Sequence, residues 1–487
     1  MQKKIKYGTI VNRASLQKLQ LCDFNNEKLN ILYISYIFCT YPTYFEERFL
    51  NMKIYYYTFG CKVNQYETEH IREKFEQEGN ATVKDIASAD VCVINSCTVT
   101  EQADQKCLQL LRRIRKISPR AVTVLAGCFP QAFSEKAEGL TDCDIIVGTE
   151  NKGSIPELTD KFMKTEERII SISKHTKGEK IDSMTNSSGG EKTRSYIKIQ
   201  DGCDCYCTYC IIPYARGHIR SKPLEEVIRE AEQNIAAGHK ELILTGINLC
   251  FYGKDLPDRP TLTDVIESIC SLEGKFRVRL GSIEPEMILE DDIKRLSVLD
   301  KLCPHFHLSL QSGSDSILKA MNRRYDSTEY SALCRSLREY FPNCAITTDI
   351  MVGFPGENDK AFEESLSFAK EISFADAHIF PYSRRAGTKA NDLPEQVPQH
   401  IKHDRAKRMA EVCAKTKADY LSSCVGNVLE VLFERETEAE WHCGHAPNYV
   451  VVKVPRDKSG DSWRRQIRKV RIISADIEFC YGEIVQD

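Results

Sequence analysis

The chain has 487 residues, of which 42% are hydrophobic, enough for about three domains with packed cores. Its 67 basic and 70 acidic side chains nearly balance, so the chain as a whole is not a polycation and any contact with nucleic acid must come from local patches. The 21 cysteines are odd in number and scattered through apolar segments, which fits buried or metal-bound thiols in a reducing cytoplasm better than a disulfide framework.

Residues 1–51 differ in composition from the rest of the chain. They mix Lys, Asn and Gln with a short aromatic stretch, 31–41, that has neither a helical nor a strand period. A signal peptide would need its apolar region nearer the start, and no run in the chain approaches the roughly 20 apolar residues of a membrane span. We expect a poorly ordered extension or a misassigned start, and no association with membranes.

Residues 52–170 alternate short apolar strands with amphipathic helices. The expected strands are 53–58, 91–94, 121–125 and 144–147, with helices near 65–77 and 101–117. This alternation predicts a doubly wound α/β domain.

Cys61, Cys97 and Cys128 each follow the carboxyl end of one of these predicted strands. Parallel strands bring such ends to the same edge of a sheet, so the three thiols are expected to converge in space. A lone cysteine is more often a core residue, which is the interpretation for Cys92 and Cys143. Three on successive strand ends predict an iron–sulfur cluster site.

A polar stretch over 171–194 predicts a linker, after which strands and helices alternate for about six units over 195–423. The expected strands are 196–199, 242–245, 276–280, 306–310, 346–352 and 377–380. Six such units predict an open, partial (β/α)6 barrel, in which active sites lie on loops at the carboxyl ends of strands.

The loop after the first of these strands holds Cys203, Cys207 and Cys210 in a C-x-x-x-C-x-x-C spacing. Three thiolates in one tight loop can bind a 4Fe-4S cluster and leave its fourth iron open for an outside ligand, naturally S-adenosylmethionine. The alternative is a closed zinc site, which needs four ligands. Cys205 could supply the fourth, but alternating adjacent cysteines would strain a tetrahedron, so Cys205 is expected to be a spare thiol.

Other strand ends offer groups suited to a sulfonium ligand. Gly246 would let the backbone approach it closely, Glu284 and Gln311 could hold its amino or ribose groups, and Tyr209 in the cysteine loop could contact its adenine. Turn chemistry or helix capping is the alternative for each of them.

The last segment, 424–487, contains short strands and predicts a small antiparallel β-barrel. The expected strands are 428–433, 449–454, 470–473 and 481–485. Between Lys453 and Arg471 basic residues strongly outnumber acidic ones, and Trp463 adjoins Arg464. This pattern suits phosphate contacts and base stacking, with a solvated barrel face as the alternative.

Six motifs together resemble those of the radical S-adenosylmethionine methylthiotransferases. They are Tyr57-Thr-Phe-Gly-Cys-Lys-Val-Asn-Gln-Tyr-Glu-Thr-Glu69, Ile94-Asn-Ser-Cys-Thr-Val-Thr100, the cysteine loop 200–217, His307-Leu-Ser-Leu-Gln-Ser-Gly-Ser314, Thr348-Asp-Ile-Met-Val-Gly-Phe-Pro-Gly-Glu357 and Phe380-Pro-Tyr-Ser-Arg384. The resemblance covers the chain from about Met52 onward. It implies a methylthiotransferase domain, a radical S-adenosylmethionine domain and a C-terminal TRAM RNA-binding barrel. It also implies an auxiliary 4Fe-4S cluster on Cys61, Cys97 and Cys128 and a radical 4Fe-4S cluster on Cys203, Cys207 and Cys210.

Within this family the lysine in Gly60-Cys-Lys-Val-Asn64 and the phrase Leu244-Thr-Gly-Ile-Asn248 are most similar to the branch that acts on threonylcarbamoyladenosine in tRNA. The resemblance then implies insertion of sulfur and a methyl group at C2 of the modified adenosine beside the anticodon. The alternatives are an isopentenyladenosine tRNA methylthiotransferase, a ribosomal-protein aspartate methylthiotransferase and a non-catalytic iron–sulfur RNA-binding module.

The implied partners are tRNA, an electron donor such as flavodoxin or ferredoxin, and a sulfur donor. The threonylcarbamoyl group carries a carboxylate, which is costly to bury without a cation, and bidentate arginine is the usual answer. Arg216, Arg384 and Arg385 are the candidates, although a structural or solvated arginine is the commoner situation.

Overall fold

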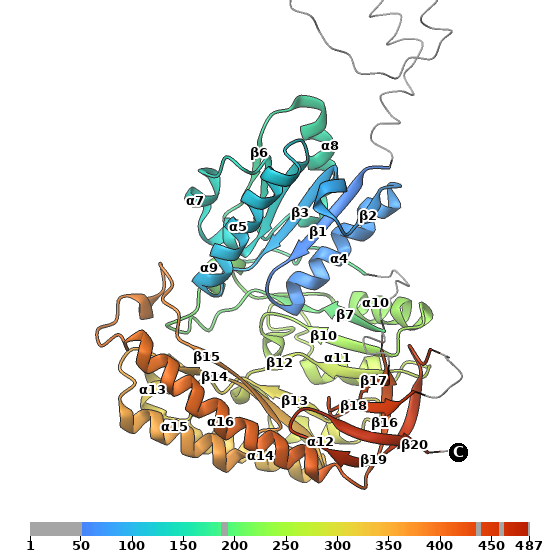
Figure 1. Cartoon of the computed structure of the whole chain (residues 1–487), viewed down its shortest axis with the longest axis vertical. Helices are drawn as coiled ribbons and strands as arrows, with labels where there is room; N and C mark the ends of the chain where they lie inside the picture. The colour runs from blue at the N-terminus through green and yellow to red at the C-terminus, as the bar shows by residue number, and fades with distance from the viewer. Residues whose placement is uncertain (1–50, 187–192, 435–439, 457–461, 486–487) are drawn as a thin grey trace, which may run out of the picture. The chain divides into compact units, whose positions relative to one another are not determined.

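The computed structural model describes residues 51–186, 193–434, 440–456 and 462–485. The predicted extension over 1–51 lies outside them except for its last residue. Residues Lys53–Asp487 form one compact unit, which contains a parallel sheet, an open barrel and a small closed barrel (Figure 1).

The N-terminal domain is a six-stranded parallel sheet in the order β2-β1-β3-β4-β5-β6. Its strands are β1 (Lys53–Thr58), β2 (Ala81–Val83), β3 (Val91–Ser96), β4 (Val122–Gly127), β5 (Ile145–Val147) and β6 (Ile169–Ser171). Every residue of β3 and β4 is buried, as expected for a sheet covered on both faces. The predicted doubly wound α/β domain is confirmed.

Helices cover both faces of this sheet. They are α4 (Lys62–Gln77), α5 (Glu101–Ile117), α6 (Cys128–Ala132), α7 (Ser134–Glu138) and α8 (Ile155–Thr165), with one-turn helices η1 (Ile86–Ser88) and η2 (Lys152–Ser154). On one face Cys107 and Leu111 of α5 pack with Cys92 and Ile94 of β3. Helices α4 and α8 contact strands from the other face. Cys92 and Cys143 are buried core residues, as predicted.

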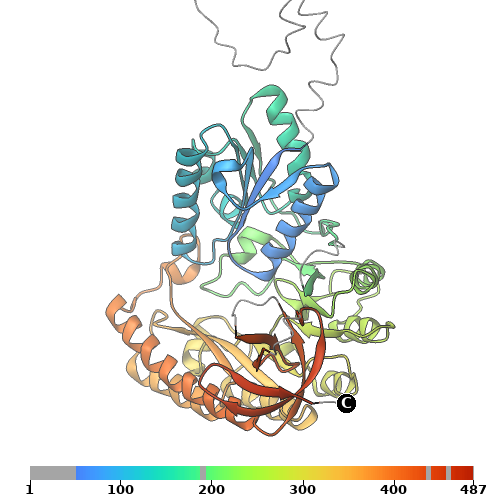
Figure 2. The ribbon, with the colours of Figure 1, turned by 45° about the vertical axis from the view of Figure 1, so that its right-hand side comes forward.

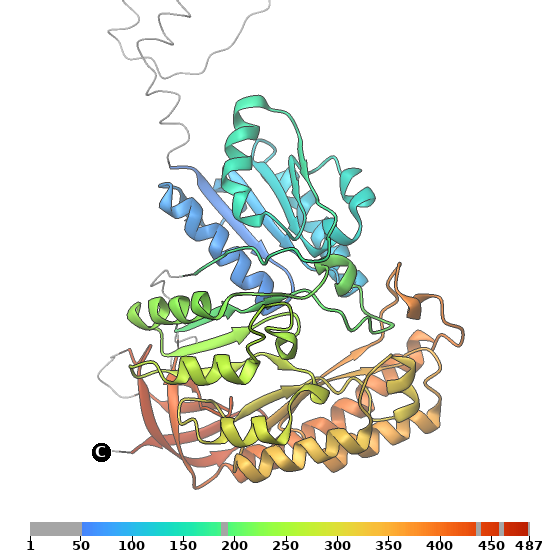
Figure 3. The ribbon, with the colours of Figure 1, turned by 180° about the vertical axis from the view of Figure 1, so that it is seen from behind.

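The central domain is an open barrel of parallel strands (Figure 3). Its strands are β7 (Arg194–Lys198), β10 (Glu241–Thr245), β11 (Arg277–Leu280), β12 (Ser282–Ile283), β13 (His305–Leu308), β14 (Ala345–Val352) and β15 (Asp376–Pro381). One sheet has the order β11-β10-β7 and the other the order β12-β13-β14-β15, and a parallel bridge between Val278 and Leu302 joins them. Only Gly281 separates β11 from β12, so together they act as one bent strand. The predicted partial (β/α)6 barrel is confirmed.

The barrel helices lie outside these strands. They are α9 (Ile212–Arg216), α10 (Leu224–Ala236), α11 (Leu262–Cys270), α12 (Glu290–Ser297), α13 (Asp315–Ala320), α14 (Ser327–Tyr340), α15 (Asp359–Ile372) and α16 (Gln399–Ser423), with η3 (Leu249–Phe251), η4 (Pro285–Met287) and η5 (Lys389–Asn391). A two-stranded antiparallel ladder, β8 (Gln200–Asp201) with β9 (Arg220–Ser221), closes the cysteine loop. Across the described ranges, we find no helix that combines the length and apolar character needed to cross a bilayer.

The C-terminal domain is a closed barrel in the order β16-β17-β18-β20-β19 (Figure 2). Its strands are β16 (Val428–Phe433), β17 (Trp441–His445), β18 (Val451–Pro455), β19 (Ile467–Ala475) and β20 (Cys480–Ile484). The predicted small barrel is confirmed, with β17 as an additional strand and β18–β20 as a parallel pair. Trp463 is 5% exposed and stacks on His442, so the expectation that it stacks on a base is wrong: it is a core residue of this barrel.

Candidate active site

Cys61, Cys97 and Cys128 lie at the carboxyl ends of β1, β3 and β4, and two glycines let these ends meet. Gly60, at φ +92°, is so close to Cys97 that a Cβ would lie 2.6 Å from the Cys97 Cβ. Gly127, at φ +108°, would place a Cβ 2.5 Å from the Ser96 carbonyl oxygen. Neither position has room for a side chain, and an L-residue would also be strained there. The structure thus brings the three predicted cysteines together.

The ionisation of these thiols reflects their proximity. The pKa of Cys97 is raised to about 12, mainly by burial and in smaller part by the neighbouring Cys128 and Cys61. Burial also raises the pKa of Cys61, with Cys128 adding to the rise and Arg216 opposing it. These shifts favour the protonated thiols of Cys61 and Cys97 in the metal-free protein, and a cationic metal centre would favour their thiolates.

A buried ionic network lies beneath this triad. The Arg216 Nε donates to the Cys128 Sγ at 3.3 Å, and its guanidinium also donates to Glu67, Asp201 and Asn64. Lys152 and Lys198 pair with the same Glu67 carboxylate. Their side chains, with that of Glu67, are at most 3% exposed.

The network holds more positive than negative charge. Arg216, Lys152 and Lys198 face the carboxylates of Glu67 and Asp201. Burial alone would raise the pKa of Glu67, but the charges of Arg216, Lys152 and Lys198 outweigh it and hold the pKa well below its usual range. An anionic group bound by the adjacent thiols would balance the excess positive charge.

The second set of cysteines occupies the loop between β8 and α9. The Cys203 N–H donates to the Gly217 carbonyl at 3.0 Å, and the Cys210 N–H donates to the Cys207 carbonyl at 3.0 Å. Burial raises the pKa of Cys210 to about 12, and Cys207 adds to the rise. Cys205 is buried, and its thiol accepts a hydrogen bond from the Asn248 side chain at 3.6 Å.

Two of the predicted S-adenosylmethionine contacts, Glu284 and Tyr209, lie at this loop. Glu284 pairs with Arg323, which also donates to the Cys207 Sγ at 3.5 Å. Burial raises the pKa of Tyr209 well above its usual value. Of its charged neighbours, Arg323 lowers this pKa and Cys207 raises it. Gln311 has a left-handed backbone, φ 67°, and among the described residues nothing bonds to its side-chain amide.

Each cysteine set offers three thiols, the kind of donor set that can hold a 4Fe-4S cluster. The thiols of each set lie on backbone that is fixed by hydrogen bonds, and in each set an arginine lies within hydrogen-bonding distance of one sulfur. Cation and N–H donors next to cluster sulfurs are a usual feature of iron–sulfur sites.

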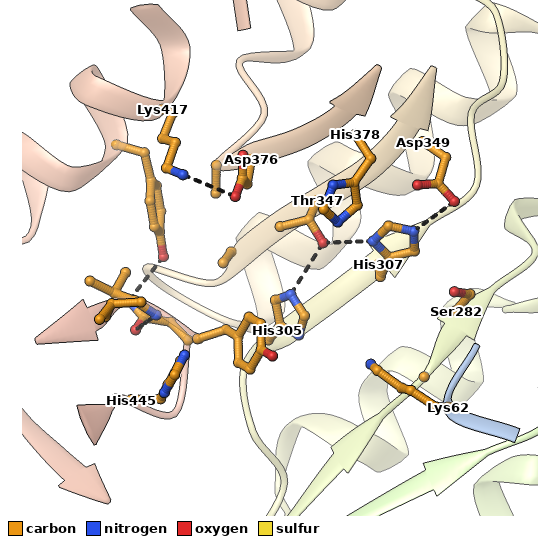
Figure 4. Close-up of a pocket in the computed structure, with 18 of the residues that line it drawn as sticks. Lys62, Ser282, His305, His307, Thr347, Asp349, Asp376, His378, Lys417 and His445 are labelled. Atoms are coloured by element: carbon orange, nitrogen blue, oxygen red, sulfur yellow. Dashed lines mark hydrogen bonds and ion pairs between the residues drawn. The ribbon is translucent and has the colours of Figure 1, made fainter. Parts of the chain in front are cut away.

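A cavity of about 690 Å³ lies between the three domains. Residues Gly60–Val63 of the N-terminal domain line it on one side, and Tyr449–Val451 of the C-terminal domain on another. The barrel contributes Gly246 and Ser282 together with side chains from β13, β14 and β15 (Figure 4). Because Cys61 belongs to this lining, the cavity opens onto the first cysteine triad.

Most charged side chains in the cavity have partners (Figure 4). Lys417 pairs with Asp376 at 3.1 Å, and the His307 Nε2 lies 3.3 Å from Asp349. His307 and His305 both share hydrogen bonds with the Thr347 hydroxyl, at 3.0 and 3.1 Å. The Lys62 ammonium has no hydrogen-bond or ion-pair partner among the residues that the structure describes.

The three predicted substrate arginines do not line this cavity. Arg216 is wholly buried in the ionic network, and Arg385 donates to Asp104 at 2.7 Å and to Thr98 at 2.6 Å. Arg384 is exposed and donates to the Asn391 carbonyl at 2.7 Å.

Several residues around the site were not anticipated from the sequence. Glu67 lies on the buried face of α4 among apolar residues. A charged residue within an apolar helix face was the sequence pattern that could have predicted a buried ion pair here. No local sequence pattern indicated Arg323 or the cluster of Glu150, His175, Glu179 and Arg220, because their main partners are distant along the chain.

Two family models match the chain, the radical SAM superfamily over residues 197–369 and the uncharacterized protein family UPF0004 over residues 53–148. Threonylcarbamoyladenosine tRNA methylthiotransferase MtaB of Bacillus subtilis is 36% identical over 437 residues, covering 88% of this chain and 96% of that protein. The chain belongs to the radical S-adenosylmethionine tRNA methylthiotransferases.

Other methylthiotransferase relatives carry a different substrate name. The tRNA-2-methylthio-N(6)-dimethylallyladenosine synthase of Caldicellulosiruptor saccharolyticus is 33% identical, covering 88% of this chain and 91% of that protein. Among solved structures, the radical S-adenosylmethionine methyltransferase TsrM from Kitasatospora setae matches with a TM-score of 0.51 at 13% identity, over 70% of this chain and 74% of that one. This likeness concerns the fold. As a methylthiotransferase the enzyme uses two 4Fe-4S clusters and S-adenosylmethionine.

Proposed function

We propose that this tRNA methylthiotransferase acts on N6-threonylcarbamoyladenosine beside the anticodon and places a methylthio group on C2 of its base. The observation that carries the proposal is a group of polar side chains in the cavity next to Cys61. The lining includes Lys62, Ser282, His307, Thr347, Asp349 and His378 beside apolar residues such as Val63 and Ala345. A threonylcarbamoyl group brings a carboxylate, a hydroxyl and amides, and its carboxylate could pair with the Lys62 ammonium, which an isopentenyl group would leave unpaired.

The two cysteine sets take separate roles in this proposal. Cys203, Cys207 and Cys210 would hold the radical cluster, and Cys61, Cys97 and Cys128 the auxiliary one. When bound, the clusters supply one-electron cleavage of S-adenosylmethionine and the sulfur that is transferred.

The protein's own residues would position the substrates. Glu284, Gln311, Gly246 and Tyr209 would orient S-adenosylmethionine beside the radical cluster. Arg323 fixes the Glu284 carboxylate in place. The cavity between the three domains would receive the unstacked base and keep water away from the reacting atoms.

The C-terminal barrel would contact the tRNA backbone. Strand β19 alternates buried apolar residues with exposed basic ones: Val470 is buried, while Lys469 and Arg471 are exposed. Exposed cations on one strand suit phosphate contacts. An electron donor such as flavodoxin or ferredoxin and a sulfur donor complete the proposed set of partners.

The test uses the anaerobically reconstituted enzyme with two anticodon stem-loops that differ only in the N6 group of one adenosine. We expect 2-methylthio-threonylcarbamoyladenosine by nucleoside mass spectrometry from the first, and little product from the isopentenyl stem-loop. Methylthiolation of isopentenyladenosine alone would overturn the substrate assignment, while product on a ribosomal-protein aspartate would move the enzyme to the protein-modifying class.

A further inference from the structure

The cavity holds two lysines in different electrostatic situations. Lys417 is paired with Asp376 at 3.1 Å, whereas Lys62 has no partner among the described residues. In Figure 4 Lys62 enters from the N-terminal domain, and its ammonium points toward the middle of the cavity. An ammonium that is partly removed from water and unpaired calls for an anion.

The position of Lys62 at the start of a helix also favours a bound anion. Lys62 is the first residue of α4, whose first turn contains no acidic residue. The N-terminus of a helix carries partial positive charge and favours Asp or Glu, so a lysine there adds positive charge to positive charge. The arrangement is unfavourable for the isolated helix and favourable for a bound anion.

The two carboxylates whose charges act on Lys62 make other contacts. Asp349 faces His307 at 3.3 Å, and Glu241 accepts from Arg277 and Arg279. Among the described residues neither carboxylate forms an ion pair with Lys62, so its ammonium is available to an anion from outside the chain.

We propose that Lys62 binds the carboxylate of the threonylcarbamoyl group and so selects this substrate. The inference rests on the proposed function and names the residue that would confer the selectivity. Carbon C2 of the base must reach the auxiliary site, to which Cys61 belongs, and the N6 substituent leaves the same ring on the other side of N1. The residue next to Cys61 is therefore placed to meet that substituent. A lysine ammonium offers three donors to a carboxylate.

The predicted arginines are less suited to this role. Arg216 and Arg385 already donate to carboxylates, and Arg384 is exposed; none of the three lines the cavity. Among the residues placed by the structure, Lys62 combines access to the cavity with an ammonium that makes no ion pair.

The experiment changes the charge on both sides of the contact. The anaerobically reconstituted wild-type enzyme, Lys62→Met and the control Lys294→Met, at a surface lysine of α12 outside the cavity, are each given two stem-loops, one with threonylcarbamoyladenosine and one with its neutral carboxamide. Conversion is followed by mass spectrometry, and binding without S-adenosylmethionine by fluorescence anisotropy. Methionine keeps most of the length of the lysine side chain and removes the charge.

We expect the wild type and Lys294→Met to prefer the carboxylate by about 10- to 100-fold in kcat/KM and in binding, the range for a charge-assisted hydrogen bond. Lys62→Met should lose that preference, mainly by weaker use of the acid, and Lys62→Arg should regain part of it. Iron content separates altered recognition from a lost cluster, and if Lys62→Met binds less iron, Lys62→Gln is put through the same comparison.

A preference in the Lys62 variants equal to that of the wild type would overturn the inference, and so would a wild type that treats acid and amide alike. In both cases the proposed function stands as long as threonylcarbamoyladenosine is converted. Failure of the wild type to convert it, with isopentenyladenosine converted instead, would refute the proposed function itself.

Discussion

Replacing Arg216 by Met should destabilise the N-terminal domain through the Glu67 network. The Glu67 carboxylate is fully buried and accepts from Arg216 at 2.5 and 3.1 Å. Removing one partner of a buried ion pair costs about 3–5 kcal/mol. Because Lys152 and Lys198 remain paired with Glu67, we expect the lower end, about 3 kcal/mol.

The assay must report on α4 itself. Both tryptophans, Trp441 and Trp463, lie in the C-terminal barrel, so tryptophan fluorescence would miss the change. Hydrogen exchange of metal-free protein, read by mass spectrometry on peptides from α4, measures the local opening free energy. A loss of about 3 kcal/mol corresponds to exchange about 100-fold faster.

Arg295→Met is the matched control. Arg295 pairs with Asp264 and Glu267, but its side chain is 43% exposed, and exposed pairs contribute about 0–1 kcal/mol. Exchange in α11 should then rise by less than about 5-fold. If the Arg216→Met variant speeds exchange in α4 by no more than the control speeds it in α11, Arg216 does not stabilise this domain through Glu67.

Two further outcomes test the cluster sites and the tRNA surface. Replacing either cysteine set by Ala, the radical set of Cys203, Cys207 and Cys210 or the auxiliary set of Cys61, Cys97 and Cys128, should leave iron near four per chain instead of about eight. Only loss of the radical set should abolish formation of deoxyadenosine. Arg471→Gln should weaken binding of tRNA irrespective of its modification and lower the slope of log affinity against log salt by about 1, as expected for one phosphate contact; an unchanged slope would argue against such a contact.

Strong local periodicity made most of the fold predictable. The bounds predicted for α5, 101–117, match the structure because its N-cap Thr100 and its basic last turn mark both ends. Strand β2 has three residues, too few to show a period, and α4 begins at Lys62 instead of near Gln65 because Cys61 is its N-cap.

The site was predictable where strand ends converge and unpredictable where ionic partners are distant in the chain. The positions of Cys61, Cys97 and Cys128 followed from parallel topology. The contact of Arg216 with Glu67 spans 149 residues, so no local pattern could show that this arginine was already engaged. For Trp463 the local basic residues suggested exposure, whereas closure of the barrel buried the ring.

Arg216 ends the short helix that follows the radical-cluster loop, yet it donates to Cys128 of the other domain. One arginine therefore links the surroundings of both cysteine sets, and the domains that carry these sets are not interchangeable modules. A chimera that takes its N-terminal domain from one relative and its barrel from another would have to carry Glu67, Lys152 and Asn64 together with a compatible Arg216 and Asp201. A crossover between Lys152 and Lys198 would separate these partners, so the buried network would form only if both sides of the crossover carried matching residues.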